Sequence, residues 1–338
     1  MLHEPDNPQH NPHPIAANAA ASPVAPAPGA PDGRAGAILR AIGLTKRYGE
    51  VAVVDRLDLA VAPGEVFGFL GPNGAGKTTT IAMLLGLVRP TAGRIELFGR
   101  PLATASLARV GSLVESPTFY PYLSGRDNLR VVARLTPGLP AARIAEALAM
   151  VDLDRVAARP YRTYSLGMKQ RLGIAAALLA DPELIVLDEP TNGLDPAGLV
   201  EVRALIRSLA GRGRTVFLSS HLLHEVEQVC DRVAIIQRGV AVAQGRVDEL
   251  LRGGGGFRLL PSDPDRAAAL LQALPWVGTV TRDGDYLAVE AAPERAFALS
   301  EALAGAGIYL GELTRQEQSL ERLFLTLTNA ECGVRNAE

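Results

Sequence analysis

Three short runs of mainly apolar residues stand out along the chain, at positions 66–70, 184–187 and 215–218. Each run is four or five residues long, which is the length of a strand rather than of a helix. A strand that is covered on both faces has no polar side, so nearly every position in it is apolar. We therefore predict an α/β fold in which these runs are strands of a buried parallel sheet.

Polar residues directly follow these runs and indicate where a ligand would bind. Asp188 and Glu189 follow the second run, Ser219, Ser220 and His221 follow the third, and a glycine-rich loop follows the first. Ligands of open α/β sheets bind beyond the carboxyl ends of the strands. We therefore expect these groups to share one edge of the sheet.

Other patterns divide the rest of the chain. Residues 37–61 alternate apolar and polar positions around a turn at 48–50, which predicts short antiparallel strands. Between about 115 and 165 the strand signals vanish, and the helical periodicity of Ala141–Met150 predicts an inserted helical subdomain. The main domain is expected to span residues 37–252.

A separate pattern begins at residue 253 and continues to 338. The four glycines 253–256 predict a flexible joint. The expected elements beyond it are a strand at 257–260, a helix at 264–273, a hairpin turning at 283–284, a helix at 293–303 and a strand at 308–313. This order predicts a small ferredoxin-like α+β domain. An amphipathic helix at 319–327 follows, with Leu320, Leu323, Phe324 and Leu327 on one face.

The first 36 residues are expected to form a disordered tail. They contain eight prolines and no Lys or Arg before Arg34, so they lack the basic start and apolar block of a secretory signal. They also carry His3, His10 and His13, for which a solvated tail is a better explanation than a metal site.

Composition narrows the classes of function. The net charge of -2 argues against a general affinity for nucleic acid. No window of 18 residues is apolar without interruption, so no membrane span is expected. Cys230 and Cys332 are too few for a disulfide framework, which is consistent with a reducing compartment, and each is expected to be a buried thiol.

The glycine-rich loop at 71–78 has the sequence GPNGAGKT and stands between a predicted strand and a predicted helix. Its glycines allow backbone N–H groups to converge on phosphate oxygens, and the helix directs its positive dipole end at the same anion. Lys77 is one of only three lysines among 34 basic residues. It is expected to reach the β- and γ-phosphates of a nucleotide, and the Thr78 hydroxyl to ligate Mg²⁺.

The residues at the ends of the later strands suggest hydrolysis. Asp188 can orient the magnesium ion, and Glu189 can align or deprotonate a water that attacks the γ-phosphate. His221 can contact that phosphate or water. A strand end followed by a helix cap would explain Asp188 and Glu189 without chemistry, and a core or cap role would explain His221. The phosphate loop favours the functional interpretation for the two carboxylates.

Five motifs in one order resemble the ATPase subunit of an ATP-binding cassette (ABC) transporter. They are GPNGAGKTT at 71–79, YSLGMKQR at 164–171, LIVLDEP at 184–190, GLDP at 193–196, and His221. The resemblance covers about residues 37–250. It implies a P-loop NTPase core of the RecA type, with the antiparallel and helical subdomains attached to it.

The resemblance also implies roles for single residues. Tyr48 would stack on adenine, Asp188 and Thr78 would hold Mg²⁺, Glu189 would be the catalytic base and His221 the switch histidine. The residues implied at the nucleotide of the same chain are Gly71, Pro72, Asn73, Gly74, Ala75, Gly76, Lys77, Thr78, Thr79 and Glu115, and those implied at the nucleotide of a second subunit are Ser165, Gly167 and Asp195.

Two departures from the family pattern are visible. The motif that usually reads Leu-Ser-Gly-Gly-Gln has Tyr164, Leu166 and Met168 at three of its five positions, but keeps the phosphate-facing Ser165 and Gly167. The contact to the second subunit is therefore expected through Ser165 and Gly167.

Glu115 stands where most relatives have a glutamine that reaches the metal and couples the nucleotide to the membrane subunit. The surrounding segment, 114–129, looks like the variant found in bacitracin- and lantibiotic-type exporters. That branch often gives self-protection against peptide antibiotics.

These observations predict an ATPase that uses ATP and Mg²⁺. Two copies, or one copy and a similar ATPase, are expected to close head to tail and to drive export through a separate transmembrane permease. The chain would then lie at the cytoplasmic face of the membrane. The alternatives are a soluble ABC ATPase that acts on ribosomes, iron-sulfur assembly or DNA, and a nucleotide-dependent regulatory binder with little turnover.

Overall fold

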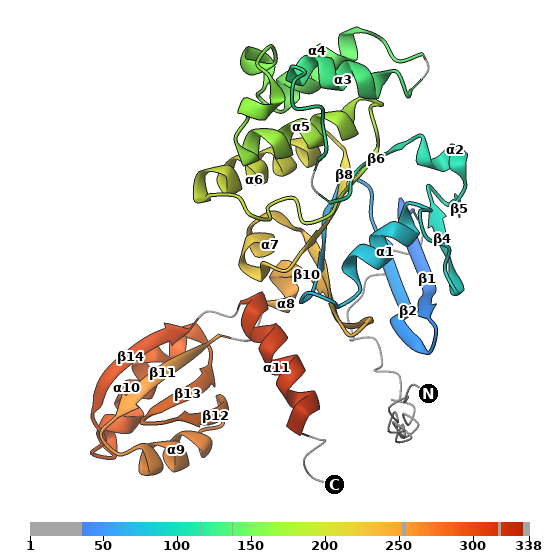
Figure 1. Cartoon of the computed structure of the whole chain (residues 1–338). Coiled ribbons are helices and arrows are strands. Elements are labelled where there is room, and N and C mark those ends of the chain that lie inside the picture. The colour runs from blue at the N-terminus through green and yellow to red at the C-terminus, as the bar shows by residue number, and fades with distance from the viewer. Residues whose placement is uncertain (1–35, 116, 137, 252–254, 317–318, 334–338) are drawn as a thin grey trace, which may run out of the picture. The chain divides into compact units, whose positions relative to one another are not determined.

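The computed structural model describes residues 36–115, 117–136, 138–251, 255–316 and 319–333 (Figure 1). The expectations for residues 1–35 of the N-terminal tail and for Gly253 and Gly254 of the glycine joint fall outside these ranges. So do those for His3, His10 and His13.

A six-stranded sheet in the order β10-β9-β3-β8-β7-β6 carries the motifs. Its strands are β3 (Val66–Leu70), β6 (Val110–Leu113), β7 (Leu184–Leu187), β8 (Thr215–Ser220), β9 (Arg232–Gln237) and β10 (Val240–Arg246). All neighbouring strands are parallel except β10, which is antiparallel to β9. The three predicted strands, β3, β8 and β7, are direct neighbours and buried throughout. The predicted parallel sheet is confirmed.

The two faces of this sheet are covered by different layers. Val66 and Leu70 of β3 pack in a core with the helices α5, α6 and α7, whereas Phe67 and Phe69 pack with α1 and a second sheet. On the second face the Phe67 and Phe217 rings are stacked, with centroids 5.7 Å apart. Alternating side chains of one strand therefore enter two cores, which explains why the run is apolar at every position.

The second sheet is antiparallel, in the order β2-β1-β4-β5. It comprises β1 (Leu39–Tyr48), β2 (Val51–Val61), β4 (Ala92–Leu97) and β5 (Arg100–Pro101). The sequence predicted short strands here, but β1 and β2 are 10 and 11 residues long. Their pairing shifts register at three places between Ala41 and Arg47, where the ladder is bulged or irregular. The alternation is therefore broken, although the strands continue.

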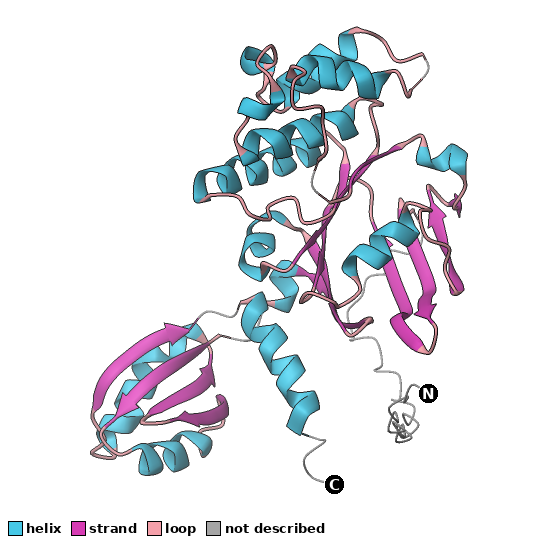
Figure 2. Ribbon diagram, viewed as in Figure 1, coloured by secondary structure: helices cyan, strands magenta, loops and turns pink. Residues whose placement is uncertain are grey.

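The helices of residues 37–252 are α1 (Lys77–Leu84), α2 (Thr104–Leu107), α3 (Gly125–Ala133), α4 (Ala142–Met150), α5 (Leu166–Leu178), α6 (Pro196–Gly211), α7 (Leu223–Val229) and α8 (Val247–Leu250). Two 3₁₀ turns lie at Asp154–Val156 and Tyr161–Thr163. Between α3 and α5 the described residues form helices and turns (Figure 2). Ser124 caps α3 by accepting a hydrogen bond from the Asp127 N–H. The Ser124 hydroxyl also donates to the Asp127 carboxylate, and this bond, more than the nearby arginines, lowers the pKa of that carboxyl.

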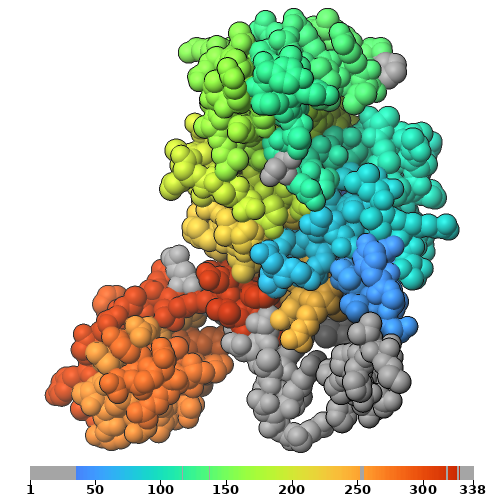
Figure 3. Space-filling view, viewed as in Figure 1, coloured from blue at the N-terminus to red at the C-terminus, as the bar shows by residue number. Residues whose placement is uncertain are grey.

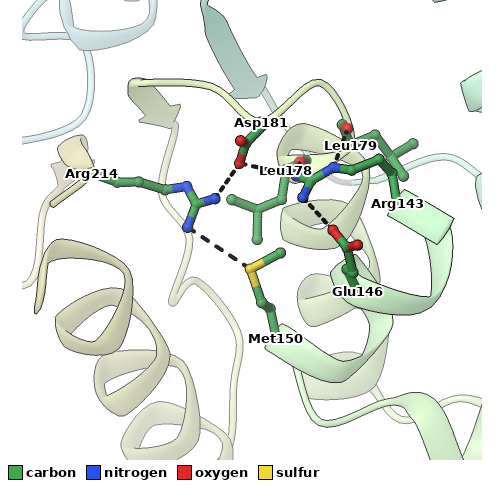
Figure 4. A network of polar contacts seen from close by, with 7 residues as sticks. All are labelled: Arg143, Glu146, Met150, Leu178, Leu179, Asp181 and Arg214. Atoms are coloured by element: carbon green, nitrogen blue, oxygen red, sulfur yellow. Dashed lines mark hydrogen bonds and ion pairs between the residues drawn. The ribbon is translucent and has the colours of Figure 1, made fainter. Parts of the chain in front are cut away.

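A polar network joins this helical segment to the end of α5 (Figure 4). The Arg143 guanidinium on α4 donates to the carbonyls of Leu178 and Leu179, at 3.0 and 3.2 Å. It also pairs with Asp181, which Arg214 contacts from the other side. A cation that donates to the last carbonyls of a helix satisfies them and opposes the dipole. The C-terminal end of α5 is thereby fixed to α4.

The C-terminal sheet has the order β12-β13-β11-β14. Its elements are β11 (Gly256–Pro261), α9 (Pro264–Gln272), β12 (Val277–Asp283), β13 (Tyr286–Ala291), a 3₁₀ turn (Pro293–Arg295), α10 (Ala296–Gly305) and β14 (Leu310–Gln316). This is the strand order of a ferredoxin-like fold, as predicted. Phe257, Leu259 and Leu287 of the sheet pack against Leu271 and Leu299 of the helices, and the orange residues form one compact body in Figure 3.

The last helix, α11 (Leu320–Gly333), packs against α7. Leu320 is fully buried in the core beside α5, α6 and α7, and its N–H donates to Glu227 Oε2 at 3.3 Å. Among the helices of the described residues, none is both long enough and apolar enough to cross a membrane.

Cys230, at the end of α7, is buried as expected, and burial raises the pKa of its thiol far above the usual range. The side chain of Cys332 is outside the described part of the chain.

Candidate active site

The glycine-rich loop connects β3 to α1, and its conformation requires glycine at several positions. Gly74 and Gly76 have φ angles of +79° and +103°. A Cβ on Gly76 would lie 2.7 Å from the Val53 carbonyl oxygen, and a Cβ on Gly71 would lie 2.4 Å from that of Ile236. Backbone therefore occupies the space that a side chain would need. Pro72, Asn73, Gly74 and Thr78 are exposed, Thr79 is half-buried, and Ala75 and Gly76 are buried.

Lys77 is the first residue of α1 and is only 6% exposed. Its Nζ donates to the carbonyl oxygens of Gly71 and Pro72, at 2.8 and 3.3 Å, and lies 3.1 Å from Glu189 Oε1. The ammonium group therefore lies inside the glycine-rich loop and connects that loop to Glu189, which follows β7. A compact cation with three donors suits this site, in which two acceptors are backbone carbonyls.

Glu189 follows β7 and has a left-handed backbone, with φ at +48°. A non-glycine residue in this region costs free energy of order 1–3 kcal/mol and is typical of functional sites. One carboxylate oxygen pairs with Lys77, and the other lies 2.8 Å from His221 Nδ1. Its side chain is about one-fifth exposed, so the carboxylate reaches the surface of the site while both oxygens are held.

Asp188 is 4% exposed, and one of its carboxylate oxygens accepts a short hydrogen bond from the Ser219 hydroxyl. Ser219 is fully buried, and its oxygen also accepts from the Glu189 N–H at 2.9 Å. This serine therefore fixes both carboxylate residues, a role that the sequence analysis did not assign to it. The feature that reveals this role is the strand register. Leu187 pairs with Leu218, so the next residues, Asp188 and Ser219, lie side by side.

The donors present at this edge fit a magnesium-bound nucleotide. The described residues contain no cluster of three or more His, Cys, Asp or Glu side chains that could hold a metal by itself. Asp188 and Thr78 offer one carboxylate and one hydroxyl oxygen, and Mg²⁺ typically takes few protein ligands and completes its shell with water and phosphate. The glycine cradle and the buried Lys77 provide for the anion.

Two further residues predicted for the nucleotide of the same chain, Tyr48 and Glu115, are both exposed. Tyr48 ends β1, is 52% exposed, and has Lys46 Nζ over its ring at 5.0 Å from the centroid. Glu115 follows β6, is exposed, and has a φ of +63°. Both side chains are accessible to a ligand. For neither does the structure show a contact with the Lys77 and Glu189 group among the described residues.

Ser165, Gly167 and Asp195 form a second group. Ser165 and Asp195 cap α5 and α6, accepting hydrogen bonds from Met168 N and Gly198 N at 3.2 and 2.9 Å. A Cβ on Gly167 would lie 3.8 Å from Gly198 Cα, so the two helix N-termini are adjacent. Both capping residues are exposed. Among the described residues, no hydrogen bond or ion pair joins this group to Lys77 or Glu189.

The chain is similar to one protein family and to several known proteins. The model of the ABC transporter family matches residues 54–192. The chain is 46% identical to the bacitracin transport ATP-binding protein BcrA of Bacillus licheniformis, over 70% of this chain and 78% of that protein. It is 40% identical to the lantibiotic transport ATP-binding protein SrtF of Streptococcus pyogenes, over 62% and 92%. A solved ATP-binding subunit of an ABC transporter shares 31% identity, with a TM-score of 0.56 over 64% of this chain and 92% of that one.

Proposed function

The chain belongs to the ATP-binding subunits of ABC transporters and hydrolyses ATP, and we propose that it uses hydrolysis to drive export through a separate membrane permease. The observation that carries this proposal is the convergence of Lys77, His221 and Ser219 on the two carboxylates that follow β7. Three neighbouring strands supply these groups, so one chain assembles the reactive edge.

In this proposal, each group at the edge has one task. The glycine loop and Lys77 bind phosphate oxygens through N–H donors and a buried positive charge. Thr78 and Asp188 would hold Mg²⁺, which neutralises phosphate charge when it is bound. When Lys77 turns to the phosphate, Glu189 Oε1 is freed and accepts the proton of the attacking water. His221 holds the other oxygen, Oε2.

The proposed assembly is a head-to-tail pair of cassettes. Ser165 and Gly167 lie at an exposed helix N-terminus, where hydroxyl and backbone donors are free to meet a phosphate from another chain. Asp195 stands at the adjacent helix start. We therefore propose that the second copy, or a similar ATPase, completes the site, and that ATP binding closes the pair.

The permease and the substrate are inferred from the relatives. BcrA and SrtF are named for bacitracin and lantibiotic transport. We propose that this chain likewise exports an antibiotic or peptide-like molecule, and that it docks at the cytoplasmic face of the membrane through the helical subdomain at about 115–165. Residues 253–338 would form an accessory domain attached to the ATPase domain at 37–252.

The test is an ATPase assay on the purified chain, alone and in vesicles with the membrane protein that co-purifies with it. We expect saturable Mg-ATP binding by calorimetry and a turnover that increases in the vesicles. Glu189→Gln should retain binding and lose most phosphate release. Absence of saturable binding would overturn the nucleotide site. An ATPase rate that is the same with and without the membrane protein would favour a soluble, non-transport ATPase.

A further inference from the structure

A ladder of three aromatic rings connects the segment after Glu115 to the N-terminus of α5. Phe119 meets Tyr161 edge-on with centroids 5.3 Å apart, and Tyr161 meets Tyr164 at 5.9 Å. Tyr161 and Tyr164 are 7% and 4% exposed. Tyr164 is followed directly by Ser165, the N-cap of α5. The ladder therefore ends next to the phosphate-facing residues of the second group.

Both tyrosine hydroxyls are anchored to backbone. The Tyr161 hydroxyl donates to the Pro117 carbonyl at 2.9 Å, and the Tyr164 hydroxyl donates to the Val156 carbonyl at 3.0 Å. Burial raises the pKa of both phenols, so they remain protonated donors at neutral pH. Each ring is therefore fixed at its outer end as well as by packing.

The surroundings leave the ladder little room to shift. A Cβ on Gly125 would lie 2.3 Å from the Tyr164 hydroxyl oxygen, so the start of α3 touches that hydroxyl. A Cβ on Gly173 of α5 would lie 3.0 Å from Pro117. Lys169 Nζ on α5 lies 5.4 Å from the Tyr161 ring centroid. Glycine at 125 thus allows the start of α3 to approach the Tyr164 ring, and glycine at 173 allows α5 to approach Pro117.

We propose that Tyr161 and Tyr164 are positioning residues, which hold the N-terminus of α5, and with it Ser165, in register with the segment at Pro117 and Phe119. The far end of α5 is fixed by Arg143 (Figure 4). The rings fix the near end, so the helix presents Ser165 in one orientation. This inference rests on the proposed role of Ser165 toward the nucleotide of a second copy.

The role predicts a specific kinetic effect. A single chain first binds ATP through its own Lys77 loop, so loosening the start of α5 leaves that affinity intact. Ser165 engages only in the closed pair, where its donors must meet the phosphate in the correct geometry. Loss of a hydroxyl that anchors the ladder therefore lowers kcat and leaves the Kd for ATP unchanged.

The experiment compares Tyr161→Phe and Tyr164→Phe with Tyr286→Phe. The control loses a hydroxyl that donates to Glu312 in the C-terminal sheet, at 3.0 Å. Assayed well below the Tm of each variant, the two ladder variants are expected to lower kcat by about three- to tenfold, with Kd within about twofold. Tyr286→Phe is expected to match the wild type. Gly125→Ala keeps both hydroxyls, displaces Tyr164, and should lower kcat in the same direction.

A cycle with Ser165→Ala separates the inference from the proposed function. If Tyr164→Phe lowers kcat in the wild type but not in the Ser165→Ala background, the tyrosine acts through the serine. If Ser165→Ala lowers kcat and both ladder variants equal the control, the positioning role is overturned while the proposed function stands. If Ser165→Ala itself leaves kcat unchanged, the proposed contact to a second copy fails, and the positioning role fails with it.

Discussion

The two halves of the candidate site differ in how completely one chain builds them. In the first half, Lys77, Asp188 and Ser219 are 6%, 4% and 0% exposed, and every one of them has a partner within the chain. Around Ser165 the two capping residues, Ser165 and Asp195, are exposed, and Leu166, the first residue of α5, is 49% exposed. We call the residues around Lys77 the finished half, because they are buried and held within one chain. We call those around Ser165 the open half, because they are exposed. A single chain should therefore bind a nucleotide, whereas turnover should need two.

The largest expected effect concerns the finished half. Lys77→Ala removes the buried cation that connects the loop to Glu189, and charge-assisted hydrogen bonds of this kind contribute up to about 3 kcal/mol each. We expect ATP affinity to fall by at least roughly a hundredfold, as measured by calorimetry. Lys77→Arg separates charge from shape: it should also bind weakly, because a planar guanidinium does not fit the buried position. Wild-type affinity in Lys77→Ala would contradict the site.

A smaller effect is expected at Ser219. Ser219→Ala leaves the Asp188 oxygen and the Glu189 N–H without their buried partner, which should lower the free energy of unfolding by about 1–3 kcal/mol. Because Glu189 then loses its fixed position, kcat should fall roughly tenfold, with the Kd for ATP nearly unchanged. Ser220→Ala is the matched control, since that buried hydroxyl accepts a hydrogen bond from Leu222 N and, within the described part of the chain, touches neither carboxylate. Equal kcat in both variants would argue against the bridging role.

The open half should respond most weakly. Asp195→Ala removes the N-cap of α6 and should lower the free energy of unfolding by about 1 kcal/mol. Asp263→Ala removes the equivalent cap of α9 in the C-terminal sheet domain. Both should lower Tm by similar amounts, but only Asp195→Ala is expected to lower kcat by a few fold. A parallel loss of kcat in the two variants would show that Asp195 acts through stability alone.

The sequence was most informative where local chemistry and strand order agree. The loop at Lys77 and the carboxylates after β7 were predicted because a parallel sheet brings its strand ends to one edge. The C-terminal strand order followed from the succession of elements. The continuous apolar strands also left no ambiguity about which residues are buried.

Features that depend on pairing and packing were not predictable from the sequence. The strands predicted on either side of the turn at 48–50 are present, but their lengths of 10 and 11 residues and the register shifts between them depend on pairing. The role of Ser219 depends on a register that only the paired strands reveal. The contact between Tyr164 and Gly125 joins residues far apart in the chain, and no local pattern encodes it.

The central claim is that one chain carries a finished half and an open half of the same site. Sedimentation of purified Glu189→Gln with and without Mg-ATP tests it directly. We predict a monomer without nucleotide and a dimer with one ATP per chain when it is present, and loss of that dimer when Lys77→Ala is added. A Glu189→Gln chain that binds ATP and stays monomeric, or that still releases phosphate at the wild-type rate, would contradict the account.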